Sequence, residues 1–398
     1  MDKISQRFGW YLAVLQLFFT LCWTVYVIYL PQLAAAAKLA PGAAVAILLL
    51  DQAIFTICDF ATGVAADKIA HVLGRLGLWI VAATALSCAA FLAMPMVAGL
   101  GPLVLLAIIV VWTVTSSALR APPLMLLGKY ARKPTIPLLS ALTMLGYGIA
   151  GAIAPYLAVA LRDLDPRIPF AAASVVLILT TLGMIGAERR LAAAAAEPKK
   201  PPARAFGTMT RPAIVFALAM IALALGYQMH FALDSAPLYL RFTNAAQLQW
   251  LMPVFWIGFN ITMFPASIAT KTLGGYRVIG CAALIGALAI VAAHLAQDLG
   301  QLVAAQFAAG AAWGTVLMSA FTVAFAIGEN GGEGRMTGLL FSALALATFT
   351  RVAVVATGLN ADPMLKAILQ WAPTLCWSLA GLALLALAAA RVKRWVAA

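Results

Sequence analysis

The chain has 398 residues, of which 64% are hydrophobic and 10% are charged, and its formal net charge is +13. This composition excludes a soluble domain built around one core and indicates an all-α integral membrane protein, because a bilayer core about 30 Å thick needs apolar helices of roughly 20 residues. The basic residues lie mainly in short segments between apolar runs. We therefore expect the basic residues to lie at the surface of the lipid bilayer, and we expect no nucleic-acid partner.

Proline, glycine and charged residues divide the chain into twelve expected transmembrane spans. The first six cover residues 9–30, 43–66, 76–97, 102–128, 137–161 and 168–187. The second six cover residues 212–240, 247–270, 276–296, 301–327, 336–359 and 365–390. Residues 188–211 are rich in Pro, Lys and Arg and are expected to form a linker. The expected domains are two pseudo-symmetric six-helix bundles, residues 1–187 and 212–398.

Lys and Arg are concentrated in every second loop, in the linker and at both ends of the chain. The positive-inside rule therefore predicts a multi-pass protein of the cell (inner) membrane with a cytoplasmic linker and both termini in the cytoplasm. The cysteines lie singly within apolar runs, so we expect no disulfide framework and no metal site. No sequence motif calls for a cofactor, and a monomer is expected.

A motif follows the second expected span. Gly63 is followed four residues later by Asp67 and then by Lys68, and Gly74 and Arg75 come shortly after. A weaker copy at residues 266–277 follows the eighth span, at the same place within the second half. Duplicated halves of this kind are typical of secondary transporters.

With this motif, the twelve spans and the basic central linker, the chain resembles the major facilitator superfamily over essentially its whole length. The resemblance implies a transporter that works by alternating access. It also implies that Gly63 allows two helices to approach closely and that Asp67 accepts hydrogen bonds from a neighbouring helix N-terminus, with Arg75 or Arg335 as its basic partner. The alternative for Asp67 is a solvated turn residue. The expected cytoplasmic gate comprises Asp59, Gly63, Asp67, Lys68, Gly74 and Arg75.

Charged side chains inside spans cost roughly 2.5–3.5 kcal/mol at the helix centre on insertion scales, so each needs a cavity or a partner. Thr113, Ser116 and Arg120 share one face of the fourth span. Arg120 is suited to binding a carboxylate or phosphate of a substrate. Alternatively, it neutralises Asp51 or Asp59 of the second span.

The intramembrane acids are candidate proton carriers. Asp51 is favoured as the cavity acid, with pairing to Arg120 as the alternative, whereas Asp59 is nearer the gate. In the seventh span, His230 and Asp234 are four residues apart and are expected to form a hydrogen-bonded pair that exchanges a proton. The alternative is a locally satisfied pair near the end of the span.

Further polar and aromatic residues in the spans are candidates for the substrate cavity. They are Gln16, Trp23, Tyr227, Asn260 and Arg351. Each of the uncharged ones is more often a helix–helix contact than a ligand. Arg351 needs a counter-charge, and none is close to it in the sequence.

The function expected is secondary active transport of a small organic solute, coupled to protons. Arg120 and Arg351 favour an organic anion. Asp51, the aromatic residues and a glycine-rich fifth span resembling that of proton-coupled antiporters favour a hydrophobic or cationic compound. A protein of the same fold that acts as an assembly factor or receptor is the alternative function. No nucleophile–base set occurs among the spans, so an enzyme is not expected.

Overall fold

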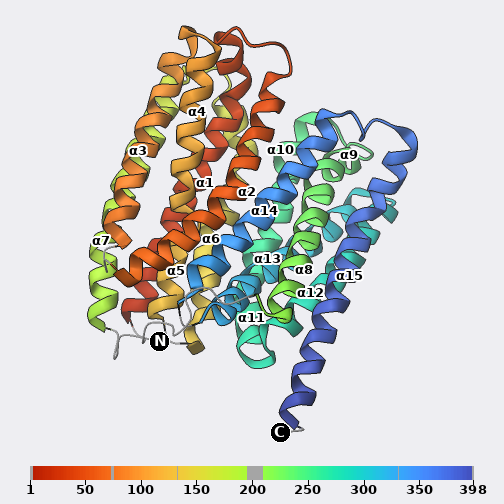
Figure 1. Ribbon diagram of the computed structural model, residues 1–398. Helices are drawn as coiled ribbons and strands as arrows, with labels where there is room; N and C mark the ends of the chain where they lie inside the picture. The colour runs from red at the N-terminus through yellow and green to blue at the C-terminus, as the bar shows by residue number, and fades with distance from the viewer. Residues whose placement is uncertain (1–2, 73–75, 132, 195–208, 330, 397–398) are drawn as a thin grey trace. The chain divides into compact units, whose positions relative to one another are not determined.

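The computed structural model describes residues 3–72, 76–131, 133–194, 209–329 and 331–396. Over these ranges the chain is helical with no strand, and twelve helices are long and apolar enough to cross a membrane (Figure 1). The expected all-α class with twelve spans is therefore confirmed.

In the first half the spans are formed by helices in the following order: α1 (Lys3–Ala36), α2 (Ala43–Val72), α3 (Leu76–Val97), α4 (Pro102–Ser116) continued by η2 (Ser117–Leu119) and α5 (Ala121–Tyr130), α6 (Ile136–Ala160) and α7 (Arg167–Ala194). In the second half the order is α8 (Arg211–Met229) continued by η4 (His230–Asp234) and α9 (Ser235–Tyr239), α10 (Leu248–Leu251) with α11 (Pro253–Leu273), α12 (Gly275–Leu295), α13 (Leu299–Ile327), α14 (Glu333–Ala356) and α15 (Pro363–Val396).

The fourth and seventh spans change helix type within their length. The fourth changes to a tighter 3-10 turn at η2, directly before Pro122 and Pro123 in the first turn of α5, because proline supplies no backbone N–H for continuous α-helical bonding. The seventh contains a wider π-helical turn, η4, at His230–Asp234. Such turns change the direction in which neighbouring side chains point.

The described chain forms two compact units. The first contains Met1–Ala205 together with Phe325–Ala345, and the second contains Phe206–Ala324 and Leu346–Ala398. Helix α14 is thus divided, because its first half packs with the first unit. The expected linker lies partly in helix α7, which runs to Ala194, and residues 195–208 lie outside the described ranges.

Close helix contacts build each unit. In the first, a Cβ added to Gly146 of α6 would lie 1.9 Å from the carbonyl oxygen of Ala13 on α1, so only glycine fits there. In the second, a Cβ on Gly286 of α12 would meet the ring of Trp377 on α15 at 1.9 Å. Glycine at such positions lets helices pack backbone against side chain without a gap.

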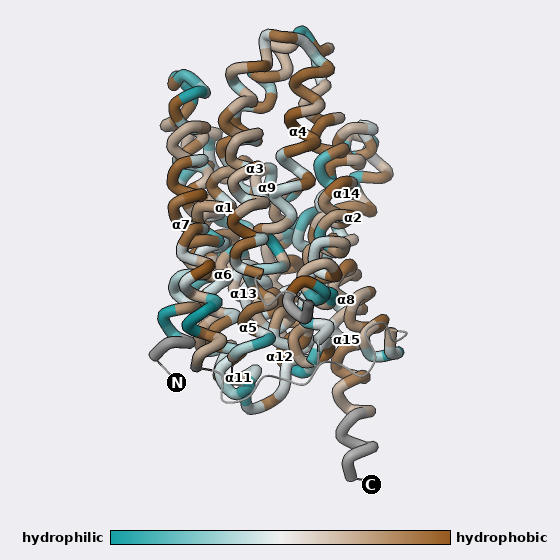
Figure 2. Tube along the Cα trace, turned by 60° about the vertical axis from the view of Figure 1, so that its left-hand side comes forward, coloured by the Kyte–Doolittle hydropathy of each residue, from teal (hydrophilic) through white to brown (hydrophobic). Residues whose placement is uncertain are grey.

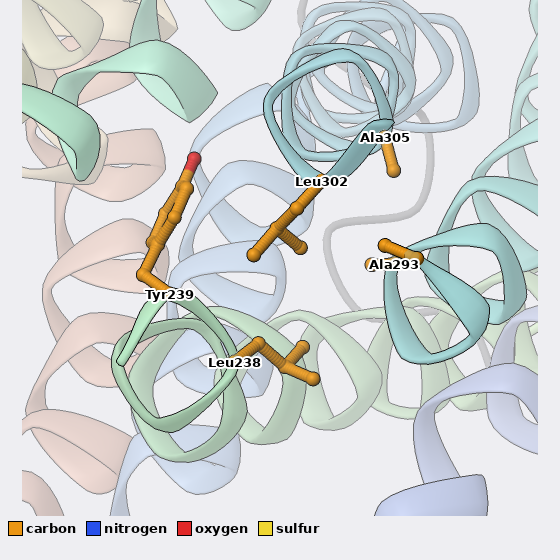
Figure 3. Close-up of a cluster of buried hydrophobic side chains, with 6 residues drawn as sticks. Leu238, Tyr239, Ala293, Leu302 and Ala305 are labelled. Carbon is orange, nitrogen blue, oxygen red and sulfur yellow. The ribbon is translucent and has the colours of Figure 1, made fainter. Parts of the chain in front are cut away.

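The lipid-facing and interior surfaces are both apolar, as expected for helices in a bilayer. Figure 2 shows hydrophobic positions along the lengths of α3, α4 and α7. Side chains such as Leu103 and Leu288 are 82% and 70% exposed. In the interior of the second unit, a buried cluster joins α9, α12 and α13 (Figure 3); its members are Leu238, Tyr239, Ala293, Ala296, Leu302 and Ala305.

Candidate functional site

One candidate site lies where α2 crosses the start of α14 within the first unit. We call it the α2–α14 clasp, and it consists of Gly63, Asp67, Gly334, Arg335 and Gly338. The Asp67 carboxylate accepts hydrogen bonds from the backbone N–H groups of Gly334 and Arg335, at 2.7 and 2.8 Å. The first N–H groups of any helix lack partners within it, and the N-terminus carries partial positive charge. The buried carboxylate therefore gives both N–H groups an acceptor, and its negative charge interacts favourably with the positive end of the α14 dipole.

Glycines bring the two backbones of the clasp together. A Cβ on Gly63 would lie 2.2 Å from the carbonyl oxygen of Gly334, and one on Gly338 would lie 2.5 Å from that of Asp59. Gly334 and Gly338 are four residues apart, so they lie on the same face of α14. Asp67 reaches the α14 N-terminus because this face has no side chains to hold α2 away.

The first unit has two further polar contacts of note. Lys133 and Glu329 form an ion pair of 2.7 Å, with side chains 73% and 33% exposed. The carboxylate of Glu188, on α7, accepts hydrogen bonds from Leu76 N at 3.1 Å and Gly77 N at 2.7 Å, and so caps the start of α3. Glu188 is buried and lies one residue beyond the expected end of the sixth span, within helix α7, which runs to Ala194.

The residues expected at a gate are only partly brought together. Asp67 and Gly63 belong to the clasp, and Lys68 is exposed on α2. Gly74 and Arg75 lie outside the described residues. The Asp59 side chain points elsewhere, although its backbone carbonyl contacts Gly338.

Asp59 forms an ion pair with Arg120. The closest atoms, Asp59 Oδ2 and Arg120 Nη1, are 3.1 Å apart, and the Asp59 side chain is fully buried. Neither oxygen of the Asp59 carboxylate has a hydrogen-bond partner among the described residues, so the contact with Arg120 is an ion pair without a hydrogen bond. The guanidinium also lies over the rings of Phe55 and Phe341, 4.7 and 5.1 Å from their centroids. Of the two acids weighed as partners of Arg120, the structure therefore selects Asp59.

Asp51 is held by neutral groups instead. It is fully buried and accepts hydrogen bonds from the Tyr26 hydroxyl at 2.7 Å and the Thr113 hydroxyl at 2.8 Å. Tyr26 and Trp23 pack on Trp112 with centroid distances of 4.5 and 5.9 Å, which forms an aromatic wall beside the carboxylate. Tyr26 is a partner that sequence reasoning missed, because it comes from another helix and matches no motif.

Other candidates of the first unit have local partners. The Gln16 amide donates to Thr20 at 3.3 Å on the same helix. The Ser116 hydroxyl donates to the Thr113 carbonyl at 3.0 Å. Ser116 also lines a small cavity of about 10 Å³ beside Trp112. Gln16 and Ser116 thus contribute to packing between turns of their own helices.

In the second unit, the expected pairing of His230 with Asp234 is replaced by two separate contacts. His230 Nε2 lies 3.2 Å from Gln306 Oε1 on α13, whereas Asp234 Oδ2 lies 3.8 Å from His294 Nε2 on α12. Both residues lie in the π-helical turn η4, and each has its partner on a neighbouring helix and not on its own. Gln306 and His294 carried no sequence signal, since each is a single polar residue in an apolar span.

Tyr227 is the centre of an aromatic cluster in this unit. Its ring stacks on Trp313 at 4.5 Å and on Phe231 at 5.9 Å, and it meets Trp256 edge-on at 6.3 Å. The Asn260 amide donates to the Trp256 carbonyl at 2.8 Å, and its Oδ1 is buried without a hydrogen-bond partner among the described residues. Arg351 on α14 is part-buried.

Comparison with known proteins places this arrangement in a known fold. No protein-family model matches the sequence, and no curated protein matches it either. The solved structures that are similar at low identity include three transporters. The human organic anion transporter MFSD10 (TETRAN) has a TM-score of 0.73 and 12% identity, covering 96% of this chain and 100% of its own. A bacterial homologue of the iron transporter ferroportin, outward-facing, has a TM-score of 0.72 and 12% identity, covering 96% and 99%.

The third structure is XylE, a major facilitator superfamily proton:xylose symporter, with a TM-score of 0.68, 14% identity and coverage of 95% and 94%. These similarities extend over nearly the whole chain. The chain therefore has the fold of the major facilitator superfamily transporters, as its sequence resemblance led us to expect.

Proposed function

We propose that this chain is a secondary active transporter that moves a small organic solute across the cell (inner) membrane by alternating access, coupled to protons. The observation that carries the proposal is the bonding of the Asp67 carboxylate to the α14 N-terminus. It joins a segment from the second half of the chain to the first unit, through a few polar contacts that can form and break.

A clasp of this kind can hold one state of an alternating-access cycle closed. Helix α14 belongs to both units, since Phe325–Ala345 packs with the first and Leu346–Ala398 with the second. On the expected cytoplasmic side, opening requires Asp67 to release two N–H groups. Water can then replace those bonds, so the cost is modest, and a solute or proton that favours one state can shift the balance.

Asp51 is the proposed proton carrier. It is fully buried, its donors are the neutral hydroxyls of Tyr26 and Thr113, and no cation pairs with it among the described residues of its unit. A buried carboxylate without a counter-charge is costly when ionised, so taking up a proton relieves that cost. Asp59 is less suited to this role because Arg120 already balances its charge.

Transport by purified protein in liposomes tests the proposal. We expect solute uptake to depend on an imposed pH gradient, and Asp51→Asn to lose at least tenfold of the gradient-driven rate. Asp163→Asn, in the loop before α7, is the control and is expected to behave as the wild type. Gradient-driven uptake that is unchanged in Asp51→Asn contradicts the proton assignment.

The same assay separates a transporter from a protein of this fold that acts as an assembly factor or receptor. A panel of labelled organic anions, neutral compounds and lipophilic cations is offered under pH and ion gradients of both signs. If none of them moves, the transport proposal is wrong. The orientation, with both termini cytoplasmic, and the monomeric state are part of the proposal and are tested by labelling of terminal tags and by light scattering.

A further inference from the structure

The two arginines inside the spans differ in their partners. Arg120 has a carboxylate 3.1 Å away. Arg351, by contrast, has no carboxylate within ion-pair distance among the described residues of its own unit, and its buried Nε has no hydrogen-bond partner there. An arginine within a span costs several kcal/mol unless its charge is balanced. The missing counter-charge points to a bound anion.

The acids within the described spans are otherwise engaged. Asp51 is held by two hydroxyls, Asp59 faces Arg120, and Asp67 caps α14. Asp234 lies 3.8 Å from His294. Asp51 has no cation beside it, but both of its carboxylate oxygens accept hydrogen bonds, whereas Arg351 has neither a carboxylate partner nor a hydrogen bond at Nε among the described residues of its unit.

The position of Arg351 beside α8 is fixed by a neighbouring hydrogen bond. Gln228 Nε2 donates to Thr348 Oγ1 at 2.9 Å, and Thr348 lies one turn before Arg351 on α14. Tyr227 directly precedes Gln228 on α8. The turn of α14 that carries Thr348 and Arg351 therefore packs against the stretch of α8 that carries the Tyr227 aromatic cluster.

This cluster supplies an apolar surface on the stretch of α8 that α14 contacts through Thr348. Phe231 is only part-buried, and its ring contacts Tyr227 at 5.9 Å and Trp256 at 5.4 Å. Tyr227 and Trp256 are more than nine-tenths buried, so they hold Phe231 in place. A flat apolar group can stack on the exposed part of Phe231 while a charged group on the same molecule reaches Arg351.

We propose that Arg351 binds the anionic group of an organic anion whose apolar body packs on Phe231. This assignment names the solute class and rests on the proposed transport function. A guanidinium presents paired N–H donors that match a carboxylate or phosphate, so it binds such groups more selectively than a lysine does. A phospholipid headgroup offers the same chemistry, and Arg351 lies in the last two turns of α14, so the experiment must separate the two sources.

Calorimetric titration of the purified full-length protein provides the test. The probes are 2-naphthoate and 2-naphthyl phosphate, their neutral analogue 2-naphthamide, and a short-chain phosphatidylglycerol. We expect at least one anionic probe to bind at least tenfold more tightly than the amide. Arg351→Gln is expected to abolish that preference, and Arg351→Lys to retain part of it. Arg277→Gln, which removes an exposed charge from the same unit, is the matched control.

Three results overturn the assignment: no preference for the anions, a preference that survives in Arg351→Gln, or Arg351-dependent binding of phosphatidylglycerol alone. Thermal unfolding of each variant shows whether it is folded. If Arg351→Gln does not fold, the Arg351→Lys variant still tests the assignment. Arg351-dependent anion binding without transport under any gradient disproves the transport function but leaves the anion site standing. Normal transport by Arg351→Gln supports the transport function and disproves the anion site.

Discussion

Gly63 on α2 and Gly334 on α14 pack backbone against backbone, because a Cβ on Gly63 would come within 2.2 Å of the Gly334 carbonyl oxygen. Residues 271 positions apart in the sequence are thus joined at a contact that admits no side chain. The contact places the Asp67 carboxylate on the α14 N-terminus, so backbone packing and polar capping depend on each other.

Gly63→Ala is expected to open the clasp. The added methyl group clashes with backbone that cannot move aside without separating α2 from α14, and overpacking of this kind costs about 1–3 kcal/mol. Free energies of unfolding in mixed micelles measure the effect. Gly186→Ala is the control, since nothing lies within 4 Å of a Cβ at Gly186. Equal stability of the two variants contradicts the close packing.

Asp67→Asn is expected to weaken the clasp with little change in shape. The amide keeps one acceptor for the α14 N–H groups but loses the charge that favours a helix N-terminus, and the loss is about 0.5–2 kcal/mol. Cross-linking detects the change when Lys133 and Glu329, which form an ion pair, are both replaced by cysteine and bridged with a short bismaleimide. The yield should fall in Asp67→Asn and stay unchanged in Asp165→Asn, an exposed acid. No fall in yield would mean that Asp67 does not hold this end closed.

The spans were predictable from sequence because their signal is local. Length, apolar content and Pro or Gly at the ends define each helix, and α3 has the predicted limits of residues 76–97. The contact of Asp67 with a helix N-terminus was predicted from the family motif and not from helical periodicity. The structure adds its partners, the N–H groups of Gly334 and Arg335, whose identity depends on which helices cross.

Side-chain partners were harder to predict for the same reason. Asp51 has Tyr26 as a donor and His230 has Gln306 as a neighbour, each from a different helix. Helical spacing shows which residues share a face but not what that face meets. Spacing also does not show that other helices offer partners, as Gln306 does for His230 and His294 does for Asp234.

Glu188→Ala is expected to destabilise the first unit by about 0.5–2 kcal/mol, as for other lost N-caps, because it leaves the N–H groups of Leu76 and Gly77 without their acceptor. Glu329→Ala is the matched control. Its ion pair with Lys133 is largely exposed, and such pairs contribute about 0–1 kcal/mol. Unfolding in mixed micelles compares the two variants, and a Glu188→Ala protein as stable as Glu329→Ala would show that the α3 cap contributes little.

The ion pair of Asp59 with Arg120 is tested by a double-mutant cycle. Asp59→Asn leaves Arg120 without its counter-charge, and breaking a buried pair in this way costs about 3–5 kcal/mol. Arg120→Gln similarly leaves the buried Asp59 carboxylate alone. The double variant removes both charges, so it should be more stable than either single variant, with an interaction energy of at least about 1 kcal/mol. Additive losses would show that each charge is balanced by some other group, and Arg120 would then return as a candidate anion site alongside Arg351.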